Sequence, residues 1–258
     1  MTTHMGKHVK ELVGKGKRLD GRAFDRYRDI VLEVGTNKCA DGFARVKFGD
    51  TEILAGIKME VGTPYPDTPD EGALVVNAEL LPLSNPKYEP GPPGIDSIEL
   101  ARVVDRGIRE SKAIDMKKLC IEEGEKCWIV SIDIIPLNSD GNLFDAAGLA
   151  AIAALRNATF PKYEDGILYS RERTDEPVPV TKTPIPVTVS KISNNLLVDL
   201  SEDEEDAVDA RLTIAVAGDK EICAMQKGGE NPLTTEEISL MIDIAFEKSK
   251  MLGKKLEG

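Results

Sequence analysis

The first half of the chain alternates between apolar and polar positions in a way that predicts β-strands. The alternation runs from Asp29 to Val34 and from Gly42 to Phe48, and an apolar run continues from Thr51 to Met59. Alternation of this kind is typical of strands with one buried face. Gly49-Asp50 separates the second and third segments, so we expect these two to form a hairpin. Two further runs are predicted as strands, Ala73 to Leu83 and Trp128 to Leu137.

Apolar positions at helical spacing predict three helices. The first follows the capping signal Asp96-Ser97-Ile98-Glu99, with Asp96 as the N-cap, and ends near Ala113. The second, Ala146 to Ala158, is rich in Ala and Leu with few polar positions, which predicts a buried helix. The third begins at the capping box Thr234-x-x-Glu237 and continues as an amphipathic pattern towards the C-terminus.

The element order predicts a mixed α/β (α+β) protein with two lobes and antiparallel pairing. A stretch rich in proline, Pro177 to Pro186, is expected to be a crossover or an edge strand, because proline does not fit a central strand. Three more strands follow, Val187 to Leu200, Arg211 to Ala217 and Glu221 to Gln226. We place an N-terminal tail or short helix with little to bury at residues 1–17, a first domain at 18–186 and a second at 187–258.

Composition and charge narrow the classes of function. The 258 residues contain no apolar run long enough to span a bilayer, and the polar, basic start shows no leader, so we expect a cytoplasmic protein. The formal net charge is −12, whereas a protein that binds nucleic acid alone usually carries a basic surface. RNA contact would therefore require a local basic patch completed by a more basic partner.

The inventory of reactive side chains excludes several chemistries. Both histidines, His4 and His8, lie in the N-terminal tail, which argues against catalysis that depends on histidine. No phosphate-binding loop or dinucleotide fingerprint is present, so no nucleotide cofactor is expected. The cysteines fit no zinc spacing and are predicted to be buried, reduced thiols. They are Cys39, Cys120, Cys127 and Cys223.

Two charged patterns have open interpretations. Arg102, Arg106 and Arg109 share one face of the first predicted helix and have the geometry to hold phosphates. The same face is also explained by ion pairs with solvent-exposed neighbours, because Glu99 to Arg102 and Asp105 to Arg109 have pairing distance on a helix. The acidic run Ser201 to Asp206 is either a divalent-metal site or, as its isolation favours, a solvated turn.

Several short motifs together resemble the RNase PH family. Each is weak alone, but their number and order from about Arg18 to the C-terminal helix make the match specific, and the closest similarity is to the non-catalytic branch found in the archaeal exosome. The motifs are Arg18-Leu-Asp-Gly-Arg22, Gly49-Asp-Thr51, Asn77-Ala-Glu79, Glu89-Pro-Gly-Pro-Pro93, Ser97-Ile-Glu-Leu-Ala-Arg-Val-Val-Asp-Arg106, Asp140-Gly-Asn142 and Met225-Gln-Lys-Gly228.

This resemblance implies a fold and a set of partners. The family has a first lobe like the second domain of ribosomal protein S5, followed by a smaller C-terminal α/β lobe. Its members form rings of six. In the archaeal exosome the non-catalytic branch alternates with a catalytic paralogue as three heterodimers, with a cap of RNA-binding subunits on one face. RNA enters the central channel and is shortened from its 3′ end by attack of phosphate.

The resemblance also implies that the phosphate-binding elements are lost. The catalytic paralogue has an Arg-Arg pair where this chain has Ile95 and Asp96. The family's Gly-Thr/Ser-Arg phosphate loop corresponds to Asn142-Leu143-Phe144, which offers neither a cation nor a hydroxyl group. An acidic and an apolar side chain at these positions would not hold phosphate, so we expect that the chain does not cleave RNA.

The family's carboxylate pair is only partly kept. Asp199 matches the first aspartate, and six residues later stands Glu205, followed by Asp206, so these three are interpreted as vestigial carboxylates. The resemblance places the first predicted helix near the neighbouring subunit and the RNA path, which favours RNA contact for its three arginines. Two other functions remain open: an active phosphate-dependent exoribonuclease that uses Asp199 with Glu205 or Asp206, and a protein scaffold without RNA contact.

Overall fold

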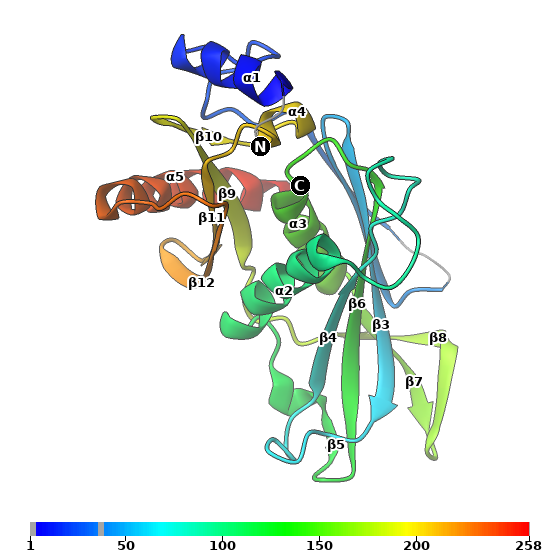
Figure 1. The fold of residues 1–258 in the computed structure, drawn as a ribbon. Helices are drawn as coiled ribbons and strands as arrows, with labels where there is room; N and C mark the ends of the chain where they lie inside the picture. Colours follow the sequence, from blue (N-terminus) through cyan, green and yellow to red (C-terminus); the bar gives the residue numbers. More distant parts are fainter. Residues whose placement is uncertain (1–3, 36–38, 258) are drawn as a thin grey trace.

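The computed structural model describes residues 4–35 and 39–257 and contains two main sheets (Figure 1). The first sheet has the strand order β1-β2-β3-β6-β4, with β5 also paired to β6. Only β4 and β6 are parallel; the other pairs of this sheet are antiparallel. Its strands are β1 (Ile30–Val34), β2 (Gly42–Phe48), β3 (Thr51–Gly62), β4 (Ala73–Ala78), β5 (Cys120–Glu122) and β6 (Lys126–Asn138).

The alternating pattern places one face of the first sheet in the core. Every second residue of β2 is buried, from Gly42 to Phe48, which confirms the predicted strand. The hairpin between β2 and β3 is also confirmed, with Phe48 opposite Thr51 and Gly49 in the left-handed region at φ 57°. The predicted strand Ala73 to Leu83 is wrong at its end. It stops at Ala78, four residues before Pro82, which has no N–H for a ladder.

Two helices lie between the first sheet and the second (Figure 1). They are α2 (Ile95–Glu110) and α3 (Leu143–Arg156). Helix α3 packs against β2 and β3 on one side and against β9 of the second sheet on the other. Gly148 permits this close approach, because a Cβ atom there would overlap the ring of Pro186. The predicted burial of this helix is confirmed, since every residue from Asp145 to Leu155 is buried.

The predicted limits of α2 require correction. Its N-cap is Gly94 and not Asp96, which already lies in the first helical turn and makes no capping hydrogen bond. The helix ends at Glu110 instead of near Ala113, because Lys112 adopts the left-handed conformation at φ 53° and turns the chain away.

The second sheet is antiparallel, with the order β10-β9-β11-β12. The predicted single strand Val187 to Leu200 is in fact two strands, since the chain reverses at Ser193, which has φ 56°. Helix α5 packs on β9 and β11, and its predicted capping box of Thr234 and Glu237 is confirmed. These elements are β9 (Ile185–Ile192), β10 (Asn195–Val198), β11 (Ala210–Ala217), β12 (Glu221–Gly228) and α5 (Thr235–Gly253).

Sequence patterning missed one hairpin, formed by β7 (Thr159–Glu164) and β8 (Ile167–Pro177). Asp165 and Gly166 join the strands with φ values of 50° and 79°. Two consecutive positive φ values are the requirement of a type I′ turn, for which Asp-Gly is a favoured sequence. The dipeptide was therefore a usable signal, although β8 is mostly exposed and neither strand has a regular alternation of buried and exposed positions.

The N-terminal segment is a docked helix, α1 (His4–Gly14), so the prediction that it has little to bury is wrong. Val9 and Val13 are buried in a small second core with residues of the C-terminal lobe, including Leu197 and Ala207. Lys10 adds an ion pair to Asp209 at 2.7 Å. The acidic run also differs from the predicted turn, because it contains a short capped helix, α4 (Glu202–Glu205).

The short 3₁₀ segments are Met116–Leu119 and Lys254–Leu256. Of the four cysteines only Cys127 is buried, while Cys39 is exposed and the other two are half-buried, so the prediction of four buried thiols is wrong. Within the described part of the chain, no helix combines the length and apolar character needed to cross a membrane.

Candidate functional site

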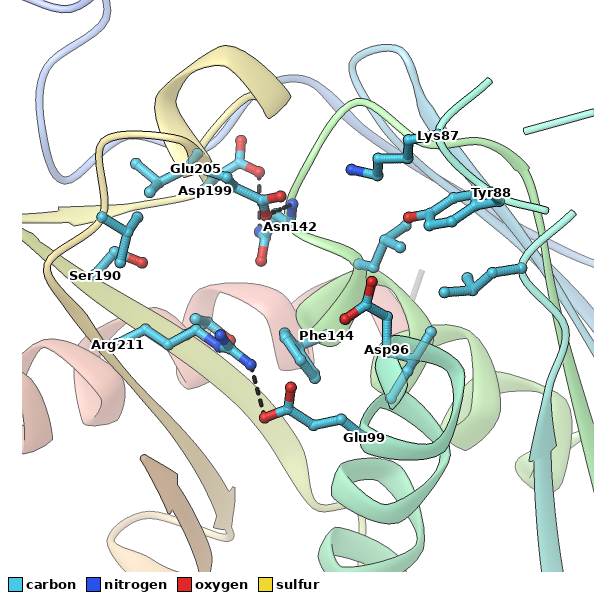
Figure 2. A pocket seen from close by; sticks show the side chains of 16 residues that line it. Lys87, Tyr88, Asp96, Glu99, Asn142, Phe144, Ser190, Asp199, Glu205 and Arg211 are labelled. Carbon is cyan, nitrogen blue, oxygen red and sulfur yellow. Dashed lines mark hydrogen bonds and ion pairs between the residues drawn. The ribbon is translucent and has the colours of Figure 1, made fainter. Parts of the chain in front are cut away.

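A cavity of about 220 Å³ opens between the two lobes, where the N-terminal ends of α2 and α3 meet β9, β11 and α4 (Figure 2). It brings together positions that are far apart in the sequence and that the family resemblance singled out. The polar and charged side chains that line it are Lys87, Tyr88, Asp96, Glu99, Asn142, Thr188, Ser190, Asp199, Glu205 and Arg211. Carboxylates outnumber cations among them by four to two.

The turn before α3 is the innermost part of this cavity. Asn142 is left-handed at φ 52°, and Gly141 before it, at φ 78°, lies too close to the backbone of Leu200 to carry a side chain. The backbone N–H of Asn142 donates to Glu205 Oε1 at 2.8 Å. Anions are favoured at the N-terminal end of a helix, where backbone N–H groups have no helical partner. Here the chain's own carboxylate takes that position.

Asp199 is a fully buried carboxylate at a left-handed position, φ 50°. Arg28 forms an ion pair to its Oδ1 at 2.9 Å, Arg22 binds Oδ2 at 2.8 Å, and the Asn142 amide donates to Oδ1 at 2.9 Å. Burial acts to raise the pKa of Asp199, but the hydrogen bonds and charge of Arg28, with Asn142, outweigh it and hold the pKa below its ordinary value. Asp199 is therefore an ionised structural group whose oxygens are already engaged.

The second vestigial carboxylate in the cavity is Glu205. Desolvation raises its pKa above the ordinary value, although the Asn142 N–H and the charges of Lys87 and Arg211 act in the opposite direction. Asp206 is exposed at the C-terminal cap of α4 and does not line the cavity. The structure thus brings Asp199 and Glu205 together and leaves Asp206 outside.

Both cations of the cavity already have partners. Arg211 forms an ion pair with Glu99 at 2.7 Å, and its guanidinium carbon lies 4.6 Å from the centre of the Phe144 ring (Figure 2). Lys87 forms an ion pair with Glu202 at 3.2 Å. The pair expected between Glu99 and Arg102 is not formed, because Glu99 turns to β11 instead.

Beneath the cavity lies a buried aspartate that sequence reasoning did not single out. Asp145, in the first turn of α3, accepts hydrogen bonds from the Tyr27 hydroxyl at 2.7 Å and from the Asn142 amide at 3.3 Å. Its Oδ1 has no hydrogen-bond partner. Burial raises the pKa of Asp145 to about 7, with the hydrogen bonds limiting the shift. The available signal was an acidic residue inside the otherwise apolar pattern of α3.

The three predicted RNA-binding arginines form a separate exposed row on α2, and none of them lines the cavity. Arg109 makes the expected ion pair with Asp105 at 2.7 Å and also donates to the Leu74 carbonyl at 3.0 Å. Arg106 donates to Gln226 Oε1 on β12 at 3.2 Å. Arg102 makes no hydrogen bond or ion pair within residues 4–35 and 39–257.

No metal centre is formed within the part of the chain that the structure covers, since its carboxylates, cysteines and histidines do not gather in groups of three or more suited to a metal ion.

Comparison with known proteins agrees with the arrangement of the chain in two lobes. Residues 26–161 match the first domain of the 3′ exoribonuclease (RNase PH) family, and residues 182–248 match its second domain. The chain belongs to the RNase PH family.

Relatives within the RNase PH family cover almost the whole chain. "Exosome complex component Rrp42" of Methanothermobacter thermautotrophicus is 45% identical over 97% of this chain and 93% of its own length. The protein of the same name from Methanosarcina acetivorans is 47% identical, again over 97% and 93%. A chain of the Archaeoglobus fulgidus exosome with RNA bound to the active site matches with a TM-score of 0.91 and 45% identity, covering 97% of each chain.

Proposed function

We propose that this chain is a non-catalytic, RNA-contacting subunit of an archaeal-type exosome. In this proposal it alternates with a catalytic RNase PH-like subunit in a ring of three heterodimers, contacts RNA in the central channel and lies beneath a cap of RNA-binding subunits in the cytoplasm. Similarity over nearly the whole chain to proteins named as exosome components, and to a chain of a solved exosome, supports the assignment to this complex.

The observation that carries the non-catalytic part is the occupied start of α3. Phosphorolysis requires donors that hold an inorganic phosphate next to the RNA backbone. Glu205 already accepts the hydrogen bond of the Asn142 N–H, so a phosphate would have to displace a carboxylate of the same sign of charge. The guanidinium that lines the cavity, that of Arg211, is paired with Glu99 and stacked on Phe144.

The arginine row on α2 supports a contribution to RNA binding. All three side chains are exposed, and Arg102 has no protein partner within the described residues, which leaves its guanidinium available to a phosphate oxygen. A chain with a net charge of −12 cannot provide a broad cationic surface by itself. The proposal therefore assigns most of the RNA-binding charge to the partner subunit.

A phosphorolysis assay with three samples tests the proposal: this chain alone, its catalytic RNase PH-like partner alone, and the two together. We expect no phosphate-dependent release of nucleoside diphosphates from this chain alone, and much higher activity from the mixture than from the partner alone. Size-exclusion chromatography with light scattering would report assembly of the ring. Activity of the isolated chain would overturn the non-catalytic assignment and favour catalysis by Asp199 with Glu205.

RNA contact is tested separately by crosslinking. A photoreactive RNA bound to the assembled ring should yield crosslinks to peptides that contain α2 of this chain. A fully assembled, active ring with no crosslink to this chain would instead establish a scaffold that does not touch RNA.

A further inference from the structure

Two cysteines face each other across the hairpin at the end of the first sheet that lies away from the cavity (Figure 1). In the antiparallel pairing of β5 and β6, Cys120 is the direct partner of Cys127. Directly opposed residues in an antiparallel pair have Cα atoms about 4.5–5.5 Å apart and side chains on the same face. Disulfides need Cα separations of about 4.4–6.8 Å, a range that includes the separation typical of residues paired in this way.

The two thiols differ in their exposure to solvent. Cys127 is fully buried, whereas Cys120 is half-buried and can be reached from solvent. Burial raises the pKa of the Cys127 thiol, and the neighbouring Cys120 thiol contributes to the same shift. On its other side Cys127 is opposite Gly62 of β3, which has no side chain to compete for space.

We propose that Cys120 and Cys127 form a reactive dithiol site that closes to an intramolecular disulfide in the presence of a small-molecule disulfide. The Cys120 thiolate attacks one sulfur of the oxidant and releases one thiol, which gives a mixed disulfide. The Cys127 thiolate then attacks the Cys120 sulfur and releases the second thiol. The protein loses two electrons and two protons, and the oxidant is reduced to two thiols. This inference is independent of the proposed RNA function.

The strand pairing of Cys127 with Cys120 explains why the second step should be fast. The Cys127 sulfur is held next to Cys120 by the strand pairing, so its effective concentration is far higher than that of a thiol in solution. The other two cysteines lie elsewhere in the fold, since Cys39 precedes β2 and Cys223 lies on β12 of the other sheet. Oxidation should therefore consume two of the four thiols and leave the other two.

The test is oxidation of the full-length protein with oxidised glutathione, followed by digestion with trypsin and mass spectrometry. Cleavage after Lys118 and Lys126 places the two cysteines on separate peptides, residues 119–126 and 127–156. We expect these peptides to be joined, with a loss of two hydrogen atoms from the intact mass. Stable glutathione adducts on Cys120 without joined peptides would overturn the proposal.

Two further measurements keep the test independent of the oxidant and of folding defects. A trivalent arsenical, which needs two adjacent thiols, should bind the reduced protein at one equivalent and should fail to bind the half-exposed variant Cys120→Ser. The matched control Cys39→Ser/Cys223→Ser should behave like the unaltered protein in both assays. Oxidation should also raise Tm, but only by about 5 °C, because stabilisation by a disulfide grows with the length of the loop that it closes and this loop is short. Equal arsenical binding by Cys120→Ser would contradict the assignment.

Discussion

At the scale of single residues, two buried aspartates near the cavity have environments that shift their pKa values in opposite directions. Asp199 lies against two arginines that keep it ionised, whereas Asp145 has only neutral hydrogen-bond partners and one unpaired oxygen. Replacement of Asp199 by asparagine and replacement of Asp145 by asparagine should therefore change the free energy of unfolding in opposite directions.

The variant Asp199→Asn should lower the free energy of unfolding by about 3 kcal/mol, because Arg22 and Arg28 would lose their shared buried carboxylate and Arg28 would keep only the partly exposed Asp140 as an ionic partner. Denaturation by guanidinium, followed by circular dichroism, measures this loss. The control is Asp70→Asn, which removes an exposed ion pair to Lys117 and should cost less than about 1 kcal/mol. Similar losses in both variants would contradict the structural role of Asp199.

Asp145 should make stability depend on pH near neutrality. Its folded-state pKa of about 7 is above the ordinary value of 3.8, so the folded protein holds a proton that the unfolded chain releases. The associated stability is fully present below pH 3.8 and is lost as the pH rises through 7. Compared with Asp145→Asn, the unaltered protein should lose about 2.5 kcal/mol of unfolding free energy between pH 5 and pH 8. Denaturant unfolding of both proteins at several pH values in this range measures the effect. If the unfolding free energies of the two proteins changed with pH by the same amount, the assignment would be refuted.

At the scale of elements, regular patterns were sufficient wherever a strand or helix buries one continuous face. The alternation in β2 and the apolar composition of α3 led to the right structures for this reason. The N-cap of α2 was misplaced because both Asp96 and Gly94 are residue types that can cap a helix locally. In the folded chain Gly94 is the N-cap. The β7–β8 hairpin was missed because β8 is largely exposed and β7 does not alternate between buried and exposed positions.

The site was less predictable than the fold, for a physical reason. Motif matching found Asp199, Glu205 and Phe144, because each lies at a fixed place in a short sequence pattern. It did not find the contact of Glu99 with Arg211, or the role of Arg28, since these depend on residues more than 100 positions apart. Only the packing of the two lobes brings them together.

The arginine row on α2 should divide into a stability function and an RNA function. Arg109 has two protein contacts, whereas Arg102 has none within the described part of the chain. Arg102→Ala should therefore weaken RNA binding by the assembled ring and reduce the slope of log affinity against log salt by about 0.7, without changing Tm. Arg109→Ala should lower Tm more than Arg102→Ala does. Fluorescence anisotropy over a salt series distinguishes the two, and an unchanged slope for Arg102→Ala would exclude its phosphate contact.

Helix α1 should depend on its two buried valines. Val13→Ala removes two methyl groups from the small core with Leu197 and should destabilise the docked helix by about 2 kcal/mol. Hydrogen exchange of the α1 amides should then accelerate while that of β6 is unchanged. Lys7→Ala, at an exposed position of the same helix, is the matched control. Equal protection of α1 in both variants would show that the helix is held by something other than this core.

At the scale of the whole molecule, the two lobes share their core instead of having one each. A single cluster of buried apolar residues continues from the first sheet through α3 to β9 and α5. The four-stranded sheet therefore has α5 on one face and depends on α2 and α3 of the other lobe for cover.

This shared core predicts that residues 182–257 will not fold alone. Without α2 and α3, the face of the sheet that includes Pro186 and Ala215 would be exposed to water. Circular dichroism and thermal unfolding of this fragment should show no cooperative transition, whereas the full chain should unfold cooperatively. A cooperative transition in the fragment would mean that the second lobe is an autonomous domain.

The docking of α1 has a consequence for how the protein is made. The surface that receives this first helix includes Leu197, Leu200 and Ala207, which leave the ribosome almost 200 residues later. At synthesis rates of about 5–20 residues per second, the apolar stripe of α1 waits roughly 10–40 s for its binding surface. Helix α1 is thus made long before its binding surface and is among the last segments to find its place, and during that interval it is a ready target for a chaperone.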